Sequence, residues 1–186
     1  MRTLVVTLCL CLCTAAAAAA AEEEGTLVMA IGTTGAQITS AQLLYKRSGA
    51  SIPILLPYLG YSTEGLFGDR PEFSDGESGV VRIKKFPPGT YEFYFLNFGN
   101  HLHTWSADRH FSLPFTIEAG KTTYLGDFAA VPLVADDEAV GAYFLVTDKH
   151  ERDIAIARRK DPALPPVTVA IPDVDSVHAV FFRSKE

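Results

Sequence analysis

The sequence predicts a mostly β protein, an antiparallel β-sandwich of the Ig-like or prealbumin-like kind, with about eight strands and one helix near the C-terminus. Three observations lead to this fold class. Apolar residues alternate with polar ones in several short segments, the period expected of half-buried strands. Turn-forming residues separate these segments at short intervals, which favours a sandwich over a parallel α/β fold. The composition, 48% hydrophobic and 11% aromatic, is rich enough to fill one core.

Three strands are expected in the first third of the chain. Residues Thr26–Ile31 alternate Leu, Met and Ile with smaller side chains, and Ile38–Arg47 continues as a second strand after a glycine-containing break. Ile52–Leu56 reads as a short third strand. Because Pro53 and Pro57 have no backbone donor, that strand would have to lie at a sheet edge.

A long loop is expected at residues 60–79, which are rich in glycine and show no sustained period. Four aromatic residues lie in or beside it: Tyr58, Tyr61, Phe67 and Phe73. Exposed, they would suit binding of a sugar, a peptide or a partner protein; alternatively, they hold the loop against the core.

The centre of the predicted fold is the segment Val80–Phe98, in which two apolar runs flank Pro87, Pro88 and Gly89. Pro-Gly suits the central positions of a type II turn. A type II turn twists the wrong way for a tight hairpin, so the connection is either a turn between paired strands or a wider arch that crosses between sheets. The second run is apolar on both faces, which requires a cover on each side.

Two strands, Phe111–Ile117 and Thr122–Phe128, are predicted to form a second hairpin around an Ala-Gly-Lys turn, and Val140–Thr147 is predicted as a further strand. Two short strands, Val167–Ile171 and Val177–Phe182, complete the prediction.

Residues 149–160 are open to two interpretations. Asp148 and Glu151 have the spacing of a capping box, and basic residues followed by Pro162 suit a helix C-terminus. The alternation of Ile154 and Ile156 with alanines fits a strand instead. The sequence favours the helix, which would then cover the outward side chains of the central strand, those of Tyr94, Leu96 and Phe98.

Residues 1–21 have the features of a secretory signal peptide: Arg2, an apolar run Leu4–Leu12, and an alanine tract that offers small residues for cleavage. The apolar run is shorter than the roughly 20 residues of a membrane span. We therefore expect an exported chain, periplasmic or secreted, whose residues 22–186 form a single domain without a membrane span.

All three cysteines, Cys9, Cys11 and Cys13, lie in this leader, so the mature chain would have no disulfide. Leu12 argues against lipid attachment at Cys13, because a lipobox has a small residue there. Removal of the leader removes Arg2, one of the 16 Lys and Arg residues. The remaining 15 basic residues and the 22 Asp and Glu residues give a net charge of −7. This acidic balance argues against nucleic-acid binding.

Histidines cluster around the only tryptophan. His101 and His103 would share one face of an extended segment, and His110 or Asp108 could complete a site for zinc or copper. The alternative is a polar loop whose imidazoles bond to water and backbone. No fixed metal-ligand spacing is present. If these histidines do not bind a metal, we expect the protein to have no cofactor.

No complete catalytic motif is present. The segment Gly60–Gly65 resembles a nucleophile elbow, but its second glycine comes one residue too late, and the mature chain lacks cysteine. Carboxylate pairs such as Asp136 with Asp137, or Glu72 with Asp75, leave a glycosidase-like hydrolase as an alternative.

The run Phe86–Tyr91, Phe-Pro-Pro-Gly-Thr-Tyr, resembles the Pro-Gly-x-Tyr signature of carboxypeptidase-regulatory-like and transthyretin-like β-sandwich domains. Ala119–Lys121 with the following strand is similar to the later hairpin of uncharacterised exported bacterial proteins of this kind. The resemblance implies an accessory or adhesive module and transfers no catalytic residue. We therefore expect a non-enzymatic binding or structural module at the cell envelope, with an envelope protein or glycan as partner. A metal-binding protein and a hydrolase are the alternatives.

Overall fold

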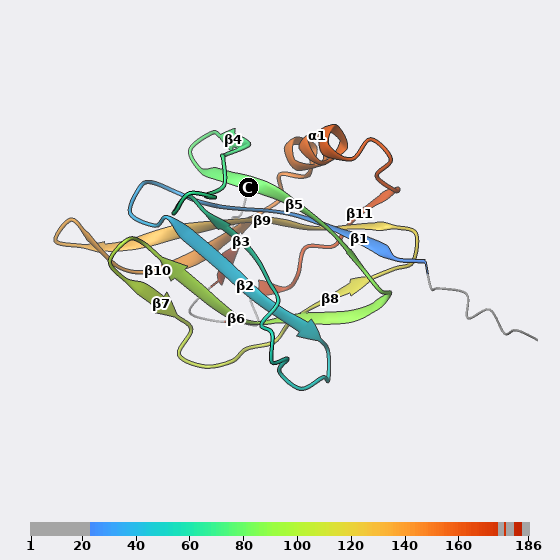
Figure 1. Ribbon diagram of the computed structural model, residues 1–186, viewed down its shortest axis with the longest axis horizontal. Coiled ribbons are helices and arrows are strands. Elements are labelled where there is room, and N and C mark those ends of the chain that lie inside the picture. The colour runs from blue at the N-terminus through green and yellow to red at the C-terminus, as the bar shows by residue number, and fades with distance from the viewer. Residues whose placement is uncertain (1–22, 175–176, 178–180, 184–186) are drawn as a thin grey trace, which may run out of the picture.

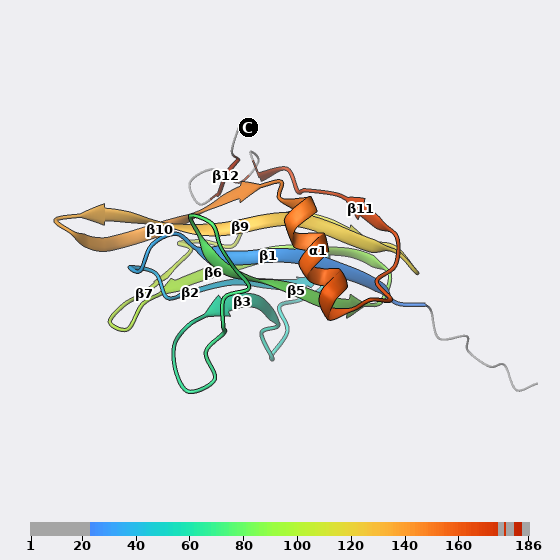
Figure 2. The ribbon, with the colours of Figure 1, turned by 90° about the horizontal axis from the view of Figure 1, so that it is seen from above.

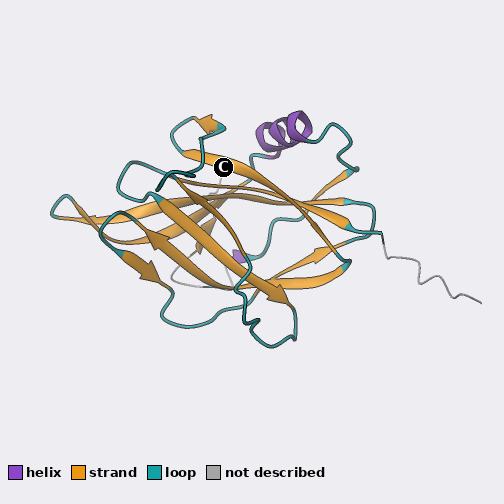
Figure 3. Cartoon of the chain, viewed as in Figure 1, coloured by secondary structure: helices purple, strands orange, loops and turns teal. Residues whose placement is uncertain are grey.

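The computed structural model describes residues 23–174, 177 and 181–183, so the predicted signal peptide and Cys13 lie outside the described residues. The described chain is mostly strand, arranged in two sheets (Figure 3), and has one α-helix. No helix in this part of the chain is long and apolar enough to cross a membrane.

The strands are assigned to two sheets (Figure 1). Sheet A has the order β12-β10-β9-β1-β5-β4, with β11 beside β9, and sheet B has the order β3-β2-β6-β7, with β8 beside β6. The elements are β1 (Gly25–Thr33), β2 (Ser40–Arg47), β3 (Tyr58–Ser62), β4 (Phe73–Ser74), β5 (Ser78–Phe86), β6 (Gly89–Gly99), β7 (Thr104–Ser106), β8 (Leu113–Ile117), β9 (Thr122–Ala135), β10 (Glu138–Thr147), α1 (His150–Lys160), β11 (Val167–Val169) and β12 (Phe181–Arg183).

Among the described strands most pairings are antiparallel, but three are parallel, and this departs from the fully antiparallel arrangement that the sequence predicted. β9 runs parallel to β1 and to β11, and β12 runs parallel to β10. The described residues contain more strands than the eight or so expected, because several are only two or three residues long. Periodicity does not detect such short strands.

One hydrophobic core lies between the two sheets. Sheet A contributes Leu27, Met29 and Ile31 of β1, and sheet B contributes large side chains such as Phe93 and Phe98. The predicted alternation of β1 is therefore confirmed. Its other face, with Val28 and Ala30, is buried in a second cluster beneath α1, and this is why β1 is apolar throughout.

The central strand β6 contains a β-bulge that the sequence did not reveal. Leu44 of β2 pairs with Phe95, and the next residue, Tyr45, pairs with Phe93, so Tyr94 has no opposite residue in β2. An extra residue reverses the alternation of side chains. Phe93 on one side of the bulge and Leu96 on the other therefore both face the core, and the apparent two-sided apolar pattern results from this change of face.

The Pro-Gly segment connects two sheets, as the wider of the two predicted connections requires. β5 lies in sheet A and β6 in sheet B.

The predicted hairpin of Phe111–Ile117 with Thr122–Phe128 is wrong because its two strands also lie in different sheets. β8 pairs with β6 in sheet B, whereas β9 pairs with β1 in sheet A, so the Ala-Gly-Lys turn also crosses between sheets.

The helix predicted from Asp148 and Glu151 is present as α1, but the capping box is not formed. Lys149 is the N-cap and makes no side-chain cap bond, while the Asp148 carboxylate accepts from the His150 N–H at 3.0 Å. The helix lies across the outer face of sheet A (Figure 2), where Ile154 and Ile156 pack in the second cluster. The prediction that it covers Tyr94, Leu96 and Phe98 is therefore wrong.

The third predicted strand is also wrong. Residues 52–56 form a loop, and the strand begins later, at Tyr58. It does lie at a sheet edge, which Arg82 of β5 covers by donating to the carbonyl of Gly60 at 2.7 Å. Such a contact keeps other chains from pairing with the edge.

Candidate functional site at the loop end

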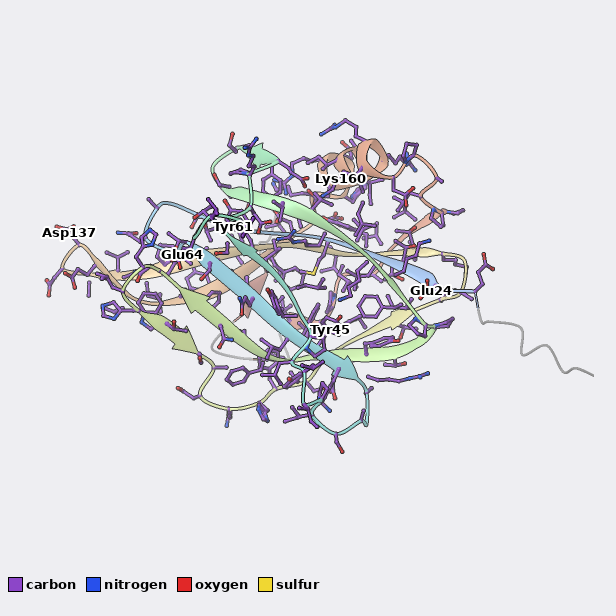
Figure 4. The ribbon with its side chains drawn as sticks, in the orientation of Figure 1. Glu24, Tyr45, Tyr61, Glu64, Asp137 and Lys160 are labelled. Carbon is purple, nitrogen blue, oxygen red and sulfur yellow. The ribbon has the colours of Figure 1, made fainter. Side chains whose placement is uncertain are left out.

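Five connections meet at one end of the two-sheet fold, which we call the loop end. They follow β1, β3, β4, β6 and β9 and comprise residues 34–39, 63–72, 75–77, 100–103 and 136–137. Figure 4 shows Asp137 at the tip of this end and Glu64 near it, on the side away from Glu24, which precedes β1. Loops gathered at one end of a rigid two-sheet fold are a common place for binding sites.

The first hollow of the loop end has a volume of about 410 Å³. It lies between residues 33–39 on one side and residues 71–78 on the other. Its lining is mostly small and hydroxyl-bearing, with Thr33, Thr39, Thr63 and Ser74 among the residues, and Glu77 supplies a carboxylate. A lining of this kind offers hydrogen bonds to a polar ligand.

A second hollow of about 310 Å³ adjoins the first and shares Ala36 and Thr39 with it. The turn between β6 and β7, with His101 and His103, forms one wall, and Glu138 of β10 belongs to the lining. Because both hollows include the same residues of the β1–β2 loop, we treat them as two parts of one site.

Thr39 is held at the junction of the two hollows. Its backbone N–H donates to the Gly99 carbonyl at 2.9 Å, its carbonyl accepts from the Thr63 N–H at 2.9 Å, and its hydroxyl donates to the Glu64 carboxylate. The His101 Nδ1 lies 3.6 Å from the same carboxylate. The loops are therefore tied to one another before any ligand arrives, which lowers the entropic cost of binding.

Of the three histidines predicted to bind metal, the structure places two at the site and one elsewhere. His101 and His103 line the second hollow, and the His103 ring packs against Trp105. His110 instead contacts the rings of Tyr94 and Phe95 at the bulge of β6. The described residues contain no group of three or more His, Cys, Asp or Glu side chains placed to hold a metal ion.

The aromatic residues near the long loop divide into two groups. Phe67 is 95% exposed and its neighbour Leu66 is 92% exposed, so both project from the β3–β4 loop into solvent. Tyr61 and Phe73 are buried and pack within the protein. Tyr58 is 53% exposed but lies at the start of β3, beside the β2–β3 loop. Of the four predicted aromatic residues, Phe67 is therefore the one that the β3–β4 loop presents to a partner, and Leu102, 83% exposed in the β6–β7 turn, is a further exposed apolar side chain.

An ionic cluster lies beneath α1 and reaches the first hollow through Glu77. The Arg152 guanidinium contacts four carboxylates, those of Asp75 at 3.1 Å, Glu77 at 2.6 Å, Asp127 at 2.9 Å and Asp153 at 2.8 Å. It also lies 3.7 Å from the centre of the Phe73 ring, a cation–π contact.

A second β-bulge places Asp127 in this cluster. Val28 of β1 pairs with Tyr124 and Ala30 pairs with Asp127, so Leu125 and Gly126 together oppose a single residue. Gly126 has a φ of 106°, which L side chains rarely adopt. Without the extra residue, Asp127 would face the core between the sheets rather than Arg152.

Burial sets the protonation of the cluster. Burial raises the pKa of Asp127 to about 9, with the nearby Glu77 carboxylate as the next cause. Besides the exposed Asp75, one guanidinium faces the three largely buried carboxyl groups of Glu77, Asp127 and Asp153 and cannot compensate all of them, so Asp127 retains its proton at neutral pH. Burial also raises the pKa of Asp153, against the opposing effect of the Tyr124 hydroxyl, which donates to it at 2.6 Å.

The carboxylate pairs considered for hydrolysis have other contacts. Glu72 is 2.9 Å from the Lys160 ammonium and accepts from the Val81 N–H, so it joins α1 to β5, and Asp75 pairs with Arg152. Asp136 and Asp137 both have positive φ and form the exposed two-residue turn between β9 and β10.

Sequence reasoning gave no role to Thr39 or to Arg152, and it considered Glu64 and Asp75 only within an incomplete elbow-like segment and a carboxylate pair. Most of these residues come from segments far apart in the chain. Arg152 and Asp127 are 25 positions apart, and Arg152 and Glu77 are 75 apart. Only the folded arrangement of β4, β5, β9 and α1 brings them together.

Comparisons with known proteins identify no family. No known protein family matches the chain, and no curated protein matches it. Among solved structures, a leucine-rich repeat protein from Bacteroides thetaiotaomicron is 13% identical, with a TM-score of 0.32. The match covers 64% of this chain and 15% of that chain. A similarity at this level supports no inference about fold family or function.

Proposed function

We propose that the mature chain is an exported, non-enzymatic binding module of the cell envelope that holds a partner protein or glycan at its loop end. The observation that carries the proposal is the pair of adjoining hollows around Thr39, of about 410 and 310 Å³. Exposed Leu102 lines the second hollow, and exposed Leu66 and Phe67 belong to the β3–β4 loop, whose Thr63 and Pro71 line the first. Polar linings with projecting apolar side chains suit recognition of a partner surface or a sugar face.

Two further observations support a binding role over catalysis. The Thr39 hydroxyl donates to the Glu64 carboxylate, and the carboxylates of Glu72 and Asp75 each form an ion pair with a basic side chain of α1. The resemblance of Phe86–Tyr91 to carboxypeptidase-regulatory-like and transthyretin-like domains adds that modules of this kind are generally accessory or adhesive.

The test is a pull-down from envelope extract with the tagged mature chain, alongside binding to purified envelope glycans. The loop-end variant replaces Leu66 and Phe67 by serine. The control variant replaces Ile54 and Leu55, which are as exposed but lie in the β2–β3 loop at the other end of β2. We expect one protein or glycan to be retained by the wild type and the control and lost by the loop-end variant.

Two results would contradict the proposal. Retention of the same partner by all three proteins would place binding outside the loop end. Reproducible turnover of an envelope substrate by the purified domain would show that the protein is an enzyme.

A further inference from the structure

The loop between β2 and β3, residues 48–57, has an exposed apolar tip. Ile54 is 100% exposed and Leu55 is 85% exposed, and more than half of the surface of Leu56 and of Tyr58, at the loop base, is accessible. Figure 1 shows this loop projecting below the sheets, away from the loop end at the left. Single exposed apolar residues are common, but three consecutive ones at the tip of a projection are unusual.

The base of this loop is held firmly. The Tyr45 N–H donates to the Pro57 carbonyl at 3.0 Å, and the Lys46 ammonium donates to the Ala50 carbonyl at 2.8 Å. Pro53 and Pro57 have no N–H, so the loop has fewer backbone donors that would lose hydrogen bonds to water on entering an apolar medium. The tip is therefore suited to enter an apolar medium without unfolding.

Two cations lie near the loop base and contact neutral groups. The Arg47 guanidinium donates at 3.3 Å to a carbonyl of the β5–β6 connection, and the Lys84 ammonium lies 5.1 Å from the centre of the Tyr45 ring. The neighbouring Lys46 is compensated by Glu92 at 2.7 Å. In a chain with an excess of acidic residues, this local positive charge beside an apolar tip complements an anionic lipid surface.

We propose that loop 48–57 is a membrane-surface anchor that inserts Ile54 and Leu55 into an anionic lipid leaflet, with Arg47 and Lys84 at the headgroups. The projecting shape of loop 48–57 favours lipid over a protein partner. A single projecting loop does not supply the roughly 800 Å² that each side of a specific protein interface buries. With the tip inserted, Tyr58 at the loop base would lie at the level of the headgroups, where aromatic residues are enriched in membrane proteins. This proposal does not depend on the function of the loop end.

The two ends of β2 give the anchored protein an orientation. Arg47 at the C-terminal end of the strand adjoins the anchoring loop, and Ser40 at its N-terminal end adjoins the loop end. A protein held at the lipid surface by residues 48–57 would therefore turn both hollows away from the membrane.

The experiment is co-sedimentation of the mature protein with two kinds of vesicle, phosphatidylcholine alone and phosphatidylcholine with about one third phosphatidylglycerol. The test variant is Ile54→Ser with Leu55→Ser, and the matched control is Leu66→Ser with Phe67→Ser. All four side chains are strongly exposed, so equal thermal unfolding of the three proteins checks that both variants fold.

We expect the wild type to bind the anionic vesicles, and the test variant to bind them at least ten-fold more weakly, while the control binds like the wild type. An Arg47→Gln, Lys84→Gln variant should lose the preference for anionic vesicles, and added salt should weaken wild-type binding. No binding to either vesicle, or equal loss in the test and control variants, would overturn the proposal. Self-association of the wild type that the test variant abolishes, without vesicle binding, would instead assign the loop to a protein contact.

Discussion

The Arg152 guanidinium, in the first turn of α1, donates to the Asp127 carboxyl group in the bulge of β9 at 2.9 Å. Asp127 is fully buried and Arg152 is mostly so, and three other carboxylates contact the same guanidinium. The helix is therefore joined to sheet A by a hydrogen bond of Arg152 as well as by the apolar contacts of Ile154 and Ile156.

Removal of Arg152 should destabilise the protein strongly. Arg152→Met keeps much of the packing volume over Phe73 but leaves buried carboxylates without a counter-charge. We expect a loss of about 3–5 kcal/mol in the free energy of unfolding, measured by urea denaturation. Arg159→Met, at an exposed position of the same helix, should change it by less than about 0.5 kcal/mol. Equal effects of the two substitutions would contradict the assigned role of Arg152.

Asp127 should give the stability a specific pH dependence. Its pKa is raised from 3.8 to about 9, so the folded protein keeps a proton that the unfolded chain releases. This contribution is complete below pH 3.8 and is lost as pH rises toward 9. Asp127→Asn lacks the titration, so the stability of the wild type relative to this variant should fall between those pH values. Urea midpoints across the range measure the difference, and a constant difference would refute the prediction.

Gly126 should resist substitution because of its backbone conformation. Its φ is 106°, and a Cβ there would lie 3.2 Å from the Thr147 carbonyl oxygen. We expect Gly126→Ala to cost about 1–3 kcal/mol in thermal unfolding. At Gly141 an added Cβ has only an ordinary contact with Leu133 at 3.6 Å, so Gly141→Ala is the control and should change stability by less than about 1 kcal/mol. Equal costs would show that the bulge tolerates a side chain.

The metal prediction can be tested by calorimetry with zinc and copper. Because His110 packs at the β6 bulge while His101 and His103 line the second hollow, we expect no binding tighter than about micromolar. Tighter binding that His101→Ala with His103→Ala abolishes would contradict this expectation and support the metal hypothesis.

Local patterns predicted several elements well. The alternation in β1 and β8 and the basic C-terminus of α1 are visible in sequence because each depends on neighbouring residues. The predicted hairpin of Phe111–Ile117 with Thr122–Phe128 was wrong because the chain passes from one sheet to the other there. An Ala-Gly-Lys turn is compatible with a hairpin or with an arch, and only the partners of β8 and β9 distinguish the two.

The two bulges explain further errors. At Tyr94 an extra residue moves Leu96 and Phe98 to the core side of β6, and at Gly126 an extra residue moves Asp127 to the helix side of β9. A bulge depends on the register between two strands, so a strict period of two assigned Leu96 and Phe98 to the wrong face and gave no indication that Asp127 lies on the helix side.

The sequence by itself determined that the chain is mostly β and that residues 1–21 resemble an export signal, and it favoured a helix over a strand after β10. These properties follow from composition and from short-range periodicity. The tertiary structure alone decided which sheet each strand joins, the gathering of four carboxylates around Arg152, and the meeting of Thr39, Glu64 and His101 at the loop end. Such contacts join residues far apart in sequence, and their formation depends on strand register and on burial, which no local pattern encodes.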